Sequence, residues 1–260
     1  MKNILVVITT AFVPTGGLTT VMMNYYRMMN KEEVKIDFAS TNNPPQVLLD
    51  EIHASGSEYC QLPDRKNVLA YFFALKKLCR GYDGMHVHAN SAMAVMELQA
   101  AIWAGIKIRI IHNHSSRSQH NLLNQLFLSL YRRSFTQAVA CSDEAGEWLY
   151  GKNGFITLRN AINAKRFKFD VVKRLIMRHN FGFGDDEYVI GHIGKFMEAK
   201  NHPFLIEVFT KYHALQPKSK LLLIGDGELR HLVEAAIDKN KVNDLSLIHI
   251  SEPTRRSYIS

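Results

Sequence analysis

A pair of lysines near a glycine is the part of the sequence that points most directly to chemistry. In the segment GHIGKFMEAKNH, Gly194 and Lys195 follow an apolar run, and Lys200 lies five residues after Lys195. Two ammonium groups beside the start of a helix can hold a diphosphate and neutralise the charge that grows as a phosphate leaves. Two solvated loop lysines would show the same spacing, and this interpretation stays open as the alternative.

Glycines also follow two other apolar runs, where the chain is expected to turn from a strand into a helix. Gly16 and Gly17 lie in PTGGL near the start of the chain, and Gly225 and Gly227 lie in IGDGEL. Glycine lets the backbone come close to a ligand, and the amides at a helix N-terminus favour anions. Either pair could instead be a tight turn. The first pair is not GxGxxG, which disfavours a nicotinamide dinucleotide site.

Four histidines lie in two short segments, HVH and HNH, each at the end of an expected strand. Because the carboxyl ends of parallel strands bind ligands in doubly wound proteins, we expect a function for His112 in HNHSS, with His114 beside it. His86 and His88 lie on one face of their strand, and we interpret them as structural histidines. No cysteine or carboxylate stands with the four at ligand spacing, so we expect no metal site.

The segment ACSDEAG holds a further polar candidate. Ser142 is either the N-cap of the helix that follows or a ligand-binding residue. Cys141 has no base at a fixed offset, so we exclude it as a nucleophile. The chain has three cysteines, widely spaced and without a CxxC pair, which indicates a reducing, cytoplasmic compartment.

Short apolar runs alternate with amphipathic stretches along the whole chain, which predicts a mostly parallel sheet covered by helices. The expected strands are residues 3–8, 34–38, 85–88, 108–111, 138–141 and 156–158, then 188–193 and 220–224. The expected helices are residues 18–29, 68–78, 92–104, 122–132 and 144–150, then 171–179, 202–214 and 228–238.

The pattern changes after residue 162, where a basic stretch leads to a polar helix, a glycine-rich loop and a fresh strand–helix cycle. We therefore expect a complete Rossmann-like domain over residues 1–165 and a partial second one over residues 166–244. Residues 245–260 read LSLIHISEPTRRSYIS, which resembles the translation of a transposon-end sequencing adapter. We expect this tail to be foreign and the second domain to be cut short. The alternative is a short strand over residues 245–250 with a basic tail.

Composition and charge narrow the function classes. The 260 residues are 47% hydrophobic and 22% charged, which argues against disorder, and no apolar run is long enough to span a membrane. The net charge of +8 favours anionic partners such as phosphates or an acidic membrane face. The basic residues are scattered and form no known recognition module, so we expect no nucleic-acid partner.

Taken in order, the segments PTGGL, IIHNHSS, ACSDEAGEWLYG, LRNAIN, IGKFMEAKNHPFLIEVF and LLLIGDGELR resemble retaining glycosyltransferases of family 4. The branch that they resemble most makes bacterial exopolysaccharides and capsular polysaccharides. The resemblance covers residues 1 to about 244 and implies an α/β structure of the GT-B type. It also implies transfer of a sugar from a nucleoside diphosphate sugar to an acceptor hydroxyl, with retention at the anomeric carbon.

The resemblance assigns roles in the first domain residue by residue. Gly16 and Gly17 match the glycine loop that faces the donor diphosphate and the acceptor. His112 matches the histidine near the donor sugar, with His114 as the second choice. Ser142 matches a polar residue that faces the cleft. Asn160 also counts as a donor-side residue, in the stretch before the hinge.

In the second domain, Lys195 stands where the family usually has arginine, and Lys200 matches the family lysine. With His112 they form the implied catalytic set, and both lysines would hold the donor diphosphate. Gly194, Gly225 and Gly227 would line the nucleotide side. The family also carries two glutamates separated by seven residues in this domain. No match precedes residue 244, so we expect this chain to be an inactive fragment.

The implied substrates are a nucleotide sugar, with UDP as the expected nucleotide, and a glycan or a lipid-diphosphate-linked acceptor. No cofactor or metal is implied. The basic surface would suit peripheral contact with an anionic membrane, at its cytoplasmic face. Two alternatives remain: a nucleotide-sugar epimerase of the same fold, and a nucleotide-sugar-binding fragment without catalysis.

Overall fold

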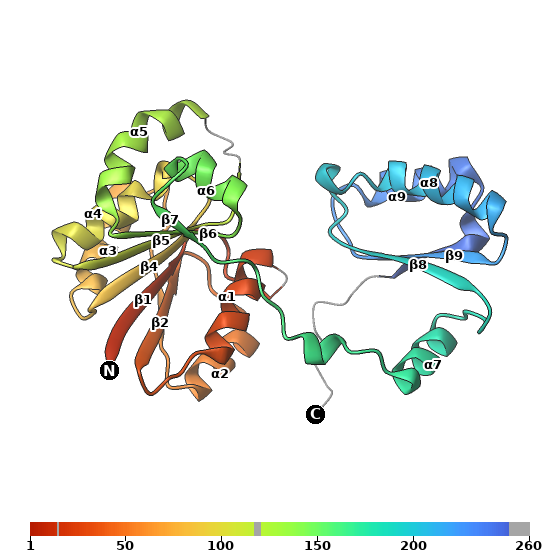
Figure 1. The fold of residues 1–260 in the computed structure, drawn as a ribbon, viewed down its shortest axis with the longest axis horizontal. Helices are drawn as coiled ribbons and strands as arrows, with labels where there is room; N and C mark the ends of the chain where they lie inside the picture. Colours follow the sequence, from red (N-terminus) through yellow and green to blue (C-terminus); the bar gives the residue numbers. More distant parts are fainter. Residues whose placement is uncertain (15, 117–120, 250–260) are drawn as a thin grey trace. The chain divides into compact units, whose positions relative to one another are not determined.

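The computed structural model describes residues 1–14, 16–116 and 121–249, and it divides the chain into two compact units (Figure 1). The first unit is Met1–Ala164 and the second is Lys165–Ser260. Residues 250–260, which include most of the tail expected to be foreign, lie outside the described residues.

The first unit is built on a parallel sheet with the strand order β3-β2-β1-β4-β5-β6-β7. The order reverses between β1 and β4, because the chain runs outward from β1 to β3 and then returns to the other side of β1. Such a reversal is where open α/β sheets bind ligands. The strands are β1 (Lys2–Ile8), β2 (Val34–Ser40), β3 (Tyr59–Gln61), β4 (Gly84–Ala89), β5 (Ile108–Asn113), β6 (Gln137–Ala140) and β7 (Phe155–Thr157).

Helices cover both faces of this sheet. One face packs against α1 (Gly17–Met28) and α2 (Gln46–Ala54), and the other against α3 (Val68–Cys79), α4 (Val95–Trp103), α5 (Asn121–Ser134) and α6 (Asp143–Tyr150). Strand β1 shows why: Leu5 and Val7 belong to the core beneath α3 and α4, whereas Val6 and Ile8 belong to the core beneath α1 and α2. A strand buried on both faces reads as a continuous apolar run.

Several predicted boundaries are wrong in this unit. Helix α2 and strand β3 were not predicted from the sequence, because β3 has only three residues and α2 begins directly after two prolines. Strand β6 ends at Ala140, so Cys141 is not part of it. The expected helix over residues 92–104 begins with a turn of 3-10 helix, Ala92–Ala94, before α4 starts.

The second unit holds a parallel sheet of β8 (Tyr188–Ile193), β9 (Ser219–Ile224) and β10 (Ser246–His249), with β9 in the centre. Helices α8 (His202–Leu215) and α9 (Arg230–Asn240) lie on the same face of that sheet (Figure 1). Their core includes Phe196, Phe209 and Leu221. Asp170 is the N-cap of helix α7 (Val171–Asn180), and its side chain accepts a hydrogen bond from the Lys173 amide at 3.0 Å.

Two expectations for the second unit change. Helix α9 begins at Arg230 and not at residue 228. Residues 225–229, between β9 and this helix, form a loop that ends in a turn. Residues 246–249 form β10, which pairs with β9 in parallel register, as the strand alternative for this segment has it. The foreign origin of the segment stays a prediction. No helix among the described residues combines the length and the apolar character needed to cross a membrane.

Candidate functional site

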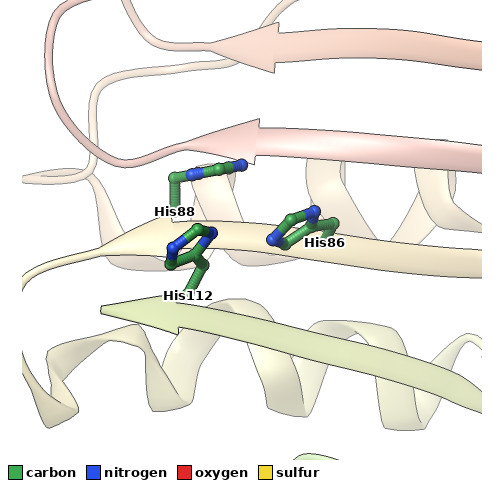
Figure 2. Close-up of side chains that lie close together, drawn as sticks. All are labelled: His86, His88 and His112. Atoms are coloured by element: carbon green, nitrogen blue, oxygen red, sulfur yellow. The ribbon is translucent and has the colours of Figure 1, made fainter. Parts of the chain in front are cut away.

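The four histidines of the HVH and HNH segments form one cluster at the carboxyl ends of β4 and β5. These strands are parallel neighbours, and their register sets His88 directly opposite His112. Because alternate residues of a strand share a face, His86 lies on the same side of β4 as His88. Figure 2 shows the three side chains gathered over the two strands. His114 follows β5, and its amide donates to the Ala89 carbonyl at 3.2 Å.

The rings of the cluster lie in contact with one another. The centroids of His86 and His88 are 4.3 Å apart, those of His88 and His112 are 5.0 Å apart, and those of His112 and His114 are 4.1 Å apart. His88 Nδ1 and His114 Nε2 share a hydrogen bond of 2.9 Å. Both ring nitrogens of His112 and Nε2 of His86 are buried without a hydrogen-bond partner among the described residues. These nitrogens are therefore available to a ligand.

Burial keeps this cluster neutral. It lowers the pKa of His86 and of His114 to about 4, and it lowers that of His112 to about 2, with further lowering at His86 and His112 from neighbouring imidazoles. The pKa of His88 lies well below the usual value for the same reasons. A neutral imidazole offers one donor and one acceptor, so the cluster can bind hydroxyl groups or a metal ion.

A cavity of about 260 Å³ lies beside the cluster, between α1 and the sheet. Three histidines, His86, His88 and His112, line it together with apolar residues such as Met22, Tyr25 and Ile110. Its wall is thus mostly apolar, with imidazole nitrogens as the main polar groups, which is the usual make-up of a small-molecule site.

Asn113 holds the loop that carries His112 and His114, and the sequence analysis did not single it out. Its side chain is buried and donates to the carbonyl oxygens of Ser115 and Ala145, each at 2.7 Å. These bonds tie the end of β5 to the start of α6. The sequence signal that could have identified Asn113 is its position directly after His112, at the end of an expected strand.

Gly16 and Gly17 lie where the sequence analysis expects them, at the start of α1. Gly16 is the N-cap of that helix, and its carbonyl accepts the first helical bond from the Thr20 amide at 2.9 Å. A Cβ on Gly17 would meet nothing within 4 Å, so the space beside this helix start is open. Exposed amides there can bind an anion.

Ser142 and Asn160 lie outside the histidine cluster. Ser142 is the N-cap of α6, and its hydroxyl accepts from the Ala145 amide at 3.1 Å, as the helix-cap alternative predicts. Asn160 is exposed in the segment after β7. Its neighbours are fixed, since the Ala161 carbonyl accepts from Asn24 Nδ2 at 3.0 Å and the Arg159 carbonyl accepts from the Tyr25 hydroxyl.

In the second unit, two loops lie against each other. The lysine loop, residues 194–201, follows β8 and carries both candidate lysines, and residues 225–229 follow β9 and carry Gly225 and Gly227. The Gly194 amide donates to the Ile224 carbonyl at 2.9 Å, and the Phe196 amide donates to the Asp226 carbonyl at 2.9 Å. A Cβ on Gly227 would lie 2.4 Å from the Phe196 carbonyl oxygen. The two loops therefore pack backbone against backbone, an approach that only glycine allows.

Both candidate lysines lie on the surface of this loop pair. The methylene stem of Lys200 passes Gly194, since its Cε is 3.6 Å from the position of a Cβ on that glycine. Lys195 and Lys200 are exposed, and neither forms an ion pair with a residue that the structure describes. Helix α8 begins two residues after Lys200. This places the Lys200 cation beside the N-terminus of α8, with the Lys195 cation on the same loop.

A second pair of histidines near this loop was missed. His202 begins α8 and is buried, and its Nε2 has no hydrogen-bond partner among the described residues. Its ring stands edge-on to that of His192, with centroids 4.8 Å apart, and burial lowers the pKa of His202. It lines a cavity of about 150 Å³ with Asn201 and Leu229. The sequence signal that could have identified His202 is its position directly before Pro203, where a helix is expected to start.

The arrangement of the two units defines the class of fold to which this protein belongs. A doubly wound parallel sheet followed by a second Rossmann-like unit is the GT-B type, as the sequence analysis expects. Residues 15–172, more than half of the chain, match the sequence profile of glycosyltransferase family 4. The chain belongs to this family.

Curated relatives carry glycosyltransferase names. EpsF of Bacillus subtilis (strain 168), whose glycosyltransferase name is provisional, is 27% identical over 254 residues, which cover 91% of this chain. The chain spans 66% of the length of EpsF. The uncharacterized glycosyltransferase MJ1059 of Methanocaldococcus jannaschii is 36% identical over 64 residues, covering 24% of this chain and 16% of that protein.

Solved structures of the same fold were crystallised with nucleotides. Anabaena HepE in complex with UDP and glucose matches 97% of this chain and 70% of its own, with a TM-score of 0.78 at 14% identity. The UDP-GlcNAc 2-epimerase of Neisseria meningitidis bound to UDP-GlcNAc matches 97% of this chain and 72% of its own, with a TM-score of 0.56 at 11% identity.

Proposed function

We propose that this chain is the donor- and acceptor-binding part of a retaining glycosyltransferase. The enzyme would move a sugar from a UDP-sugar to a glycan or a lipid-diphosphate-linked acceptor in bacterial exopolysaccharide or capsule synthesis. Family membership, the relative EpsF and the UDP complexes of HepE support this reading. The observation that carries it is the packing of the Lys195–Lys200 loop against the Gly225–Gly227 loop.

The proposed role of the lysine loop follows from charge. A nucleoside diphosphate is dianionic or more, and the leaving diphosphate gains charge as the glycosidic bond breaks. Lys195 and Lys200 have no described carboxylate partner to compete with it, and the α8 N-terminus adds partial positive charge. Gly194, Gly225 and Gly227 allow backbone amides to approach the phosphates. These groups would stabilise the leaving group, whose oxygen can accept the acceptor proton.

In the first unit, we assign His112 to the donor sugar and the reaction centre, with His114 as the second choice. Its neutral, unpartnered nitrogens suit hydrogen bonding to a sugar hydroxyl. Gly16 and Gly17 at the start of α1 would face the diphosphate or the acceptor. Ser142 and Asn160 stay in the proposal as donor-side residues, although Ser142 already caps a helix. This chemistry calls for no metal or cofactor.

We expect this chain by itself to be an inactive fragment that binds donor poorly. The paired glutamates of the family do not occur in residues 1–244. For the complete enzyme we propose a cytoplasmic location with peripheral contact at an anionic membrane, because the net charge of +8 suits a lipid-linked acceptor.

Calorimetry with UDP and UDP-glucose tests the donor site. Lys195→Ala and Lys200→Ala should each weaken binding by about 10-fold or more, since a charge-assisted hydrogen bond contributes about 1.5–3 kcal/mol. Lys211→Ala is the matched control, because Lys211 is an exposed lysine of α8 outside the loop. Lys195→Arg should bind at least as well as the unmodified chain, because guanidinium adds a bidentate fork.

Equal losses for Lys211→Ala and Lys200→Ala would show that only general charge matters, and would overturn the donor site. The alternative of an epimerase rests on the fold shared with UDP-GlcNAc 2-epimerase. It predicts epimerised or hydrolysed UDP-sugar without any acceptor, which nuclear magnetic resonance of the donor would detect.

A further inference from the structure

We propose that His86, His88 and His112 form a binding site for a divalent transition metal, with Zn²⁺ as the ion that fits best. The inference does not rest on the proposed sugar transfer, but both use His112. Both ring nitrogens of His112 lack a partner among the described residues, so one would bind the ion and the other would stay for a donor hydroxyl. It departs from the expectation of no metal, which considered ligand spacing along the sequence. The ligands here come from two strands that only the folded sheet brings together.

The pairing of β4 with β5 sets the relative positions of His86, His88 and His112. Strands β4 and β5 are central strands of the sheet, and His88 and His112 are register partners. His86 is the next residue along β4 on the same face (Figure 2). The ligand nitrogens of the three residues all lie within 4.8 Å of one another. Three ligands on two hydrogen-bonded strands form a site whose backbone is already in place.

The spacing of the rings suits zinc. Zinc–nitrogen bonds of about 2.0–2.1 Å put the centres of three tetrahedrally placed imidazoles roughly 5 Å apart. The centroid distances here are 4.3 Å for His86 and His88, 5.0 Å for His88 and His112, and 5.6 Å for His86 and His112. The rings of His86 and His112 are stacked with an interplanar angle of 4°, so they must rotate about their side-chain torsions before their nitrogens aim at one ion.

The hydrogen bonds of the cluster leave the right atoms for coordination. His86 Nε2 and both nitrogens of His112 are buried without a partner among the described residues, which is costly unless a ligand completes them. His88 Nδ1 lies 2.9 Å from His114 Nε2. When His88 donates this bond, its Nε2 carries the lone pair for the metal, and His114 is the outer partner that orients the ring.

The surroundings favour an open site. The cavity of about 260 Å³ borders all three ligands and leaves room for a fourth, exchangeable ligand. No carboxylate occurs among the described residues that line this cavity, so the ion keeps its charge and the fourth ligand is water or a small anion. Three imidazoles without a carboxylate select Zn²⁺, Co²⁺, Ni²⁺ or Cu²⁺ over Mg²⁺ or Ca²⁺.

The first test uses the unmodified chain after removal of metal with a chelator. Titration against a chromophoric zinc chelator should give one tight site per chain, and Co²⁺ should give the intense visible bands of a four-coordinate ion. X-ray absorption of the zinc form should show imidazole nitrogens and no sulfur. Zinc on sulfur, or no site tighter than that of an exposed histidine, would overturn the proposal.

The second test uses variants. His86→Gln, His88→Gln and His112→Gln should each lower zinc affinity by about 100-fold or more, whereas His53→Gln, at an exposed histidine, should leave it unchanged. His114→Phe removes the outer partner and should lower affinity by about 10- to 100-fold. His114→Gln keeps an acceptor and should restore most of it. Unchanged affinity in the three ligand variants would place the zinc elsewhere.

Discussion

The carbonyl oxygen of Gly194 lies 2.0 Å from the position that a Cβ atom on Gly225 would occupy. Gly225 also has a φ of +157°, a backbone angle that residues with a side chain rarely adopt. The two glycines therefore let the ends of β8 and β9 touch directly. Because Lys195 follows Gly194, this contact also places the cationic loop of the proposed donor site.

We expect Gly225→Ala to force these loops apart. Overpacking and backbone strain together should lower the free energy of unfolding of the second unit by about 3 kcal/mol. Gly191→Ala is the control, because a Cβ there meets nothing within 4 Å. Hydrogen exchange at the amides of β8 and β9 measures the second unit by itself. Equal protection in the two variants would show that the loops can separate freely.

The first unit holds an ion pair whose carboxylate is fully buried and whose arginine is partly buried, and it should matter more than a similar pair on the surface. Glu97 is fully buried, and its carboxylate accepts from the Tyr71 hydroxyl at 2.9 Å and from Arg65 Nη2 at 3.2 Å. Arg65→Met leaves this carboxylate without its cation and should lower the free energy of unfolding by about 3 kcal/mol.

Arg27→Met provides the control for that prediction. Arg27 also pairs with a carboxylate through two bonds, of 2.6 and 2.8 Å to Glu51, but both side chains are substantially exposed. Its loss should cost less than about 1 kcal/mol. Urea unfolding followed by tryptophan fluorescence reports on this unit, because both tryptophans of the chain, Trp103 and Trp148, lie in it. Similar losses would contradict the assigned effect of burial.

Stability of the metal-free first unit should fall as the pH falls from 7 to 5. The pKa of His86 and His114 is about 4 in the folded chain, whereas an unfolded histidine titrates near 6.5. Below pH 6.5 the unfolded state binds more protons, so acid favours unfolding by up to about 1.4 kcal/mol per pH unit for each histidine. Urea midpoints measured with a chelator present follow this slope.

His86→Gln removes one of these titrating groups and should make the stability less dependent on pH by about one proton. A slope that is the same in His86→Gln and in the unmodified chain would mean that the buried cluster does not resist protonation.

Ser142 can be assigned by separating its cap from any ligand contact. Ser142→Ala should lower the free energy of unfolding of the first unit by about 1 kcal/mol, whereas Ser142→Asp keeps an N-cap acceptor and should preserve it. Calorimetry with UDP-glucose on the same two variants gives the second reading. Weaker donor binding in both would add a ligand contact, and unchanged binding in both would leave Ser142 as a helix cap only.

The α/β class and the order of most elements follow from local patterns in the amino-acid sequence. Apolar runs such as residues 3–8 are buried on both faces, so local composition is enough to mark them as central parallel strands. The glycine motif before α9 could also be recognised from the sequence, because close backbone approach needs glycine. Diphosphate binding by the two lysines stays a prediction. Elements without a strong local signal, such as β3 with its three residues, could not be recognised in this way.

Which of these residues meet in space depends on how the strands pair. His86 and His112 are 26 residues apart in the sequence and stack at 5.6 Å because β4 and β5 pair in parallel. Gly194 and Gly225 are similarly distant and touch through β8 and β9. Strand pairing and register depend on contacts between segments far apart in the chain, so spacing along one segment does not encode them.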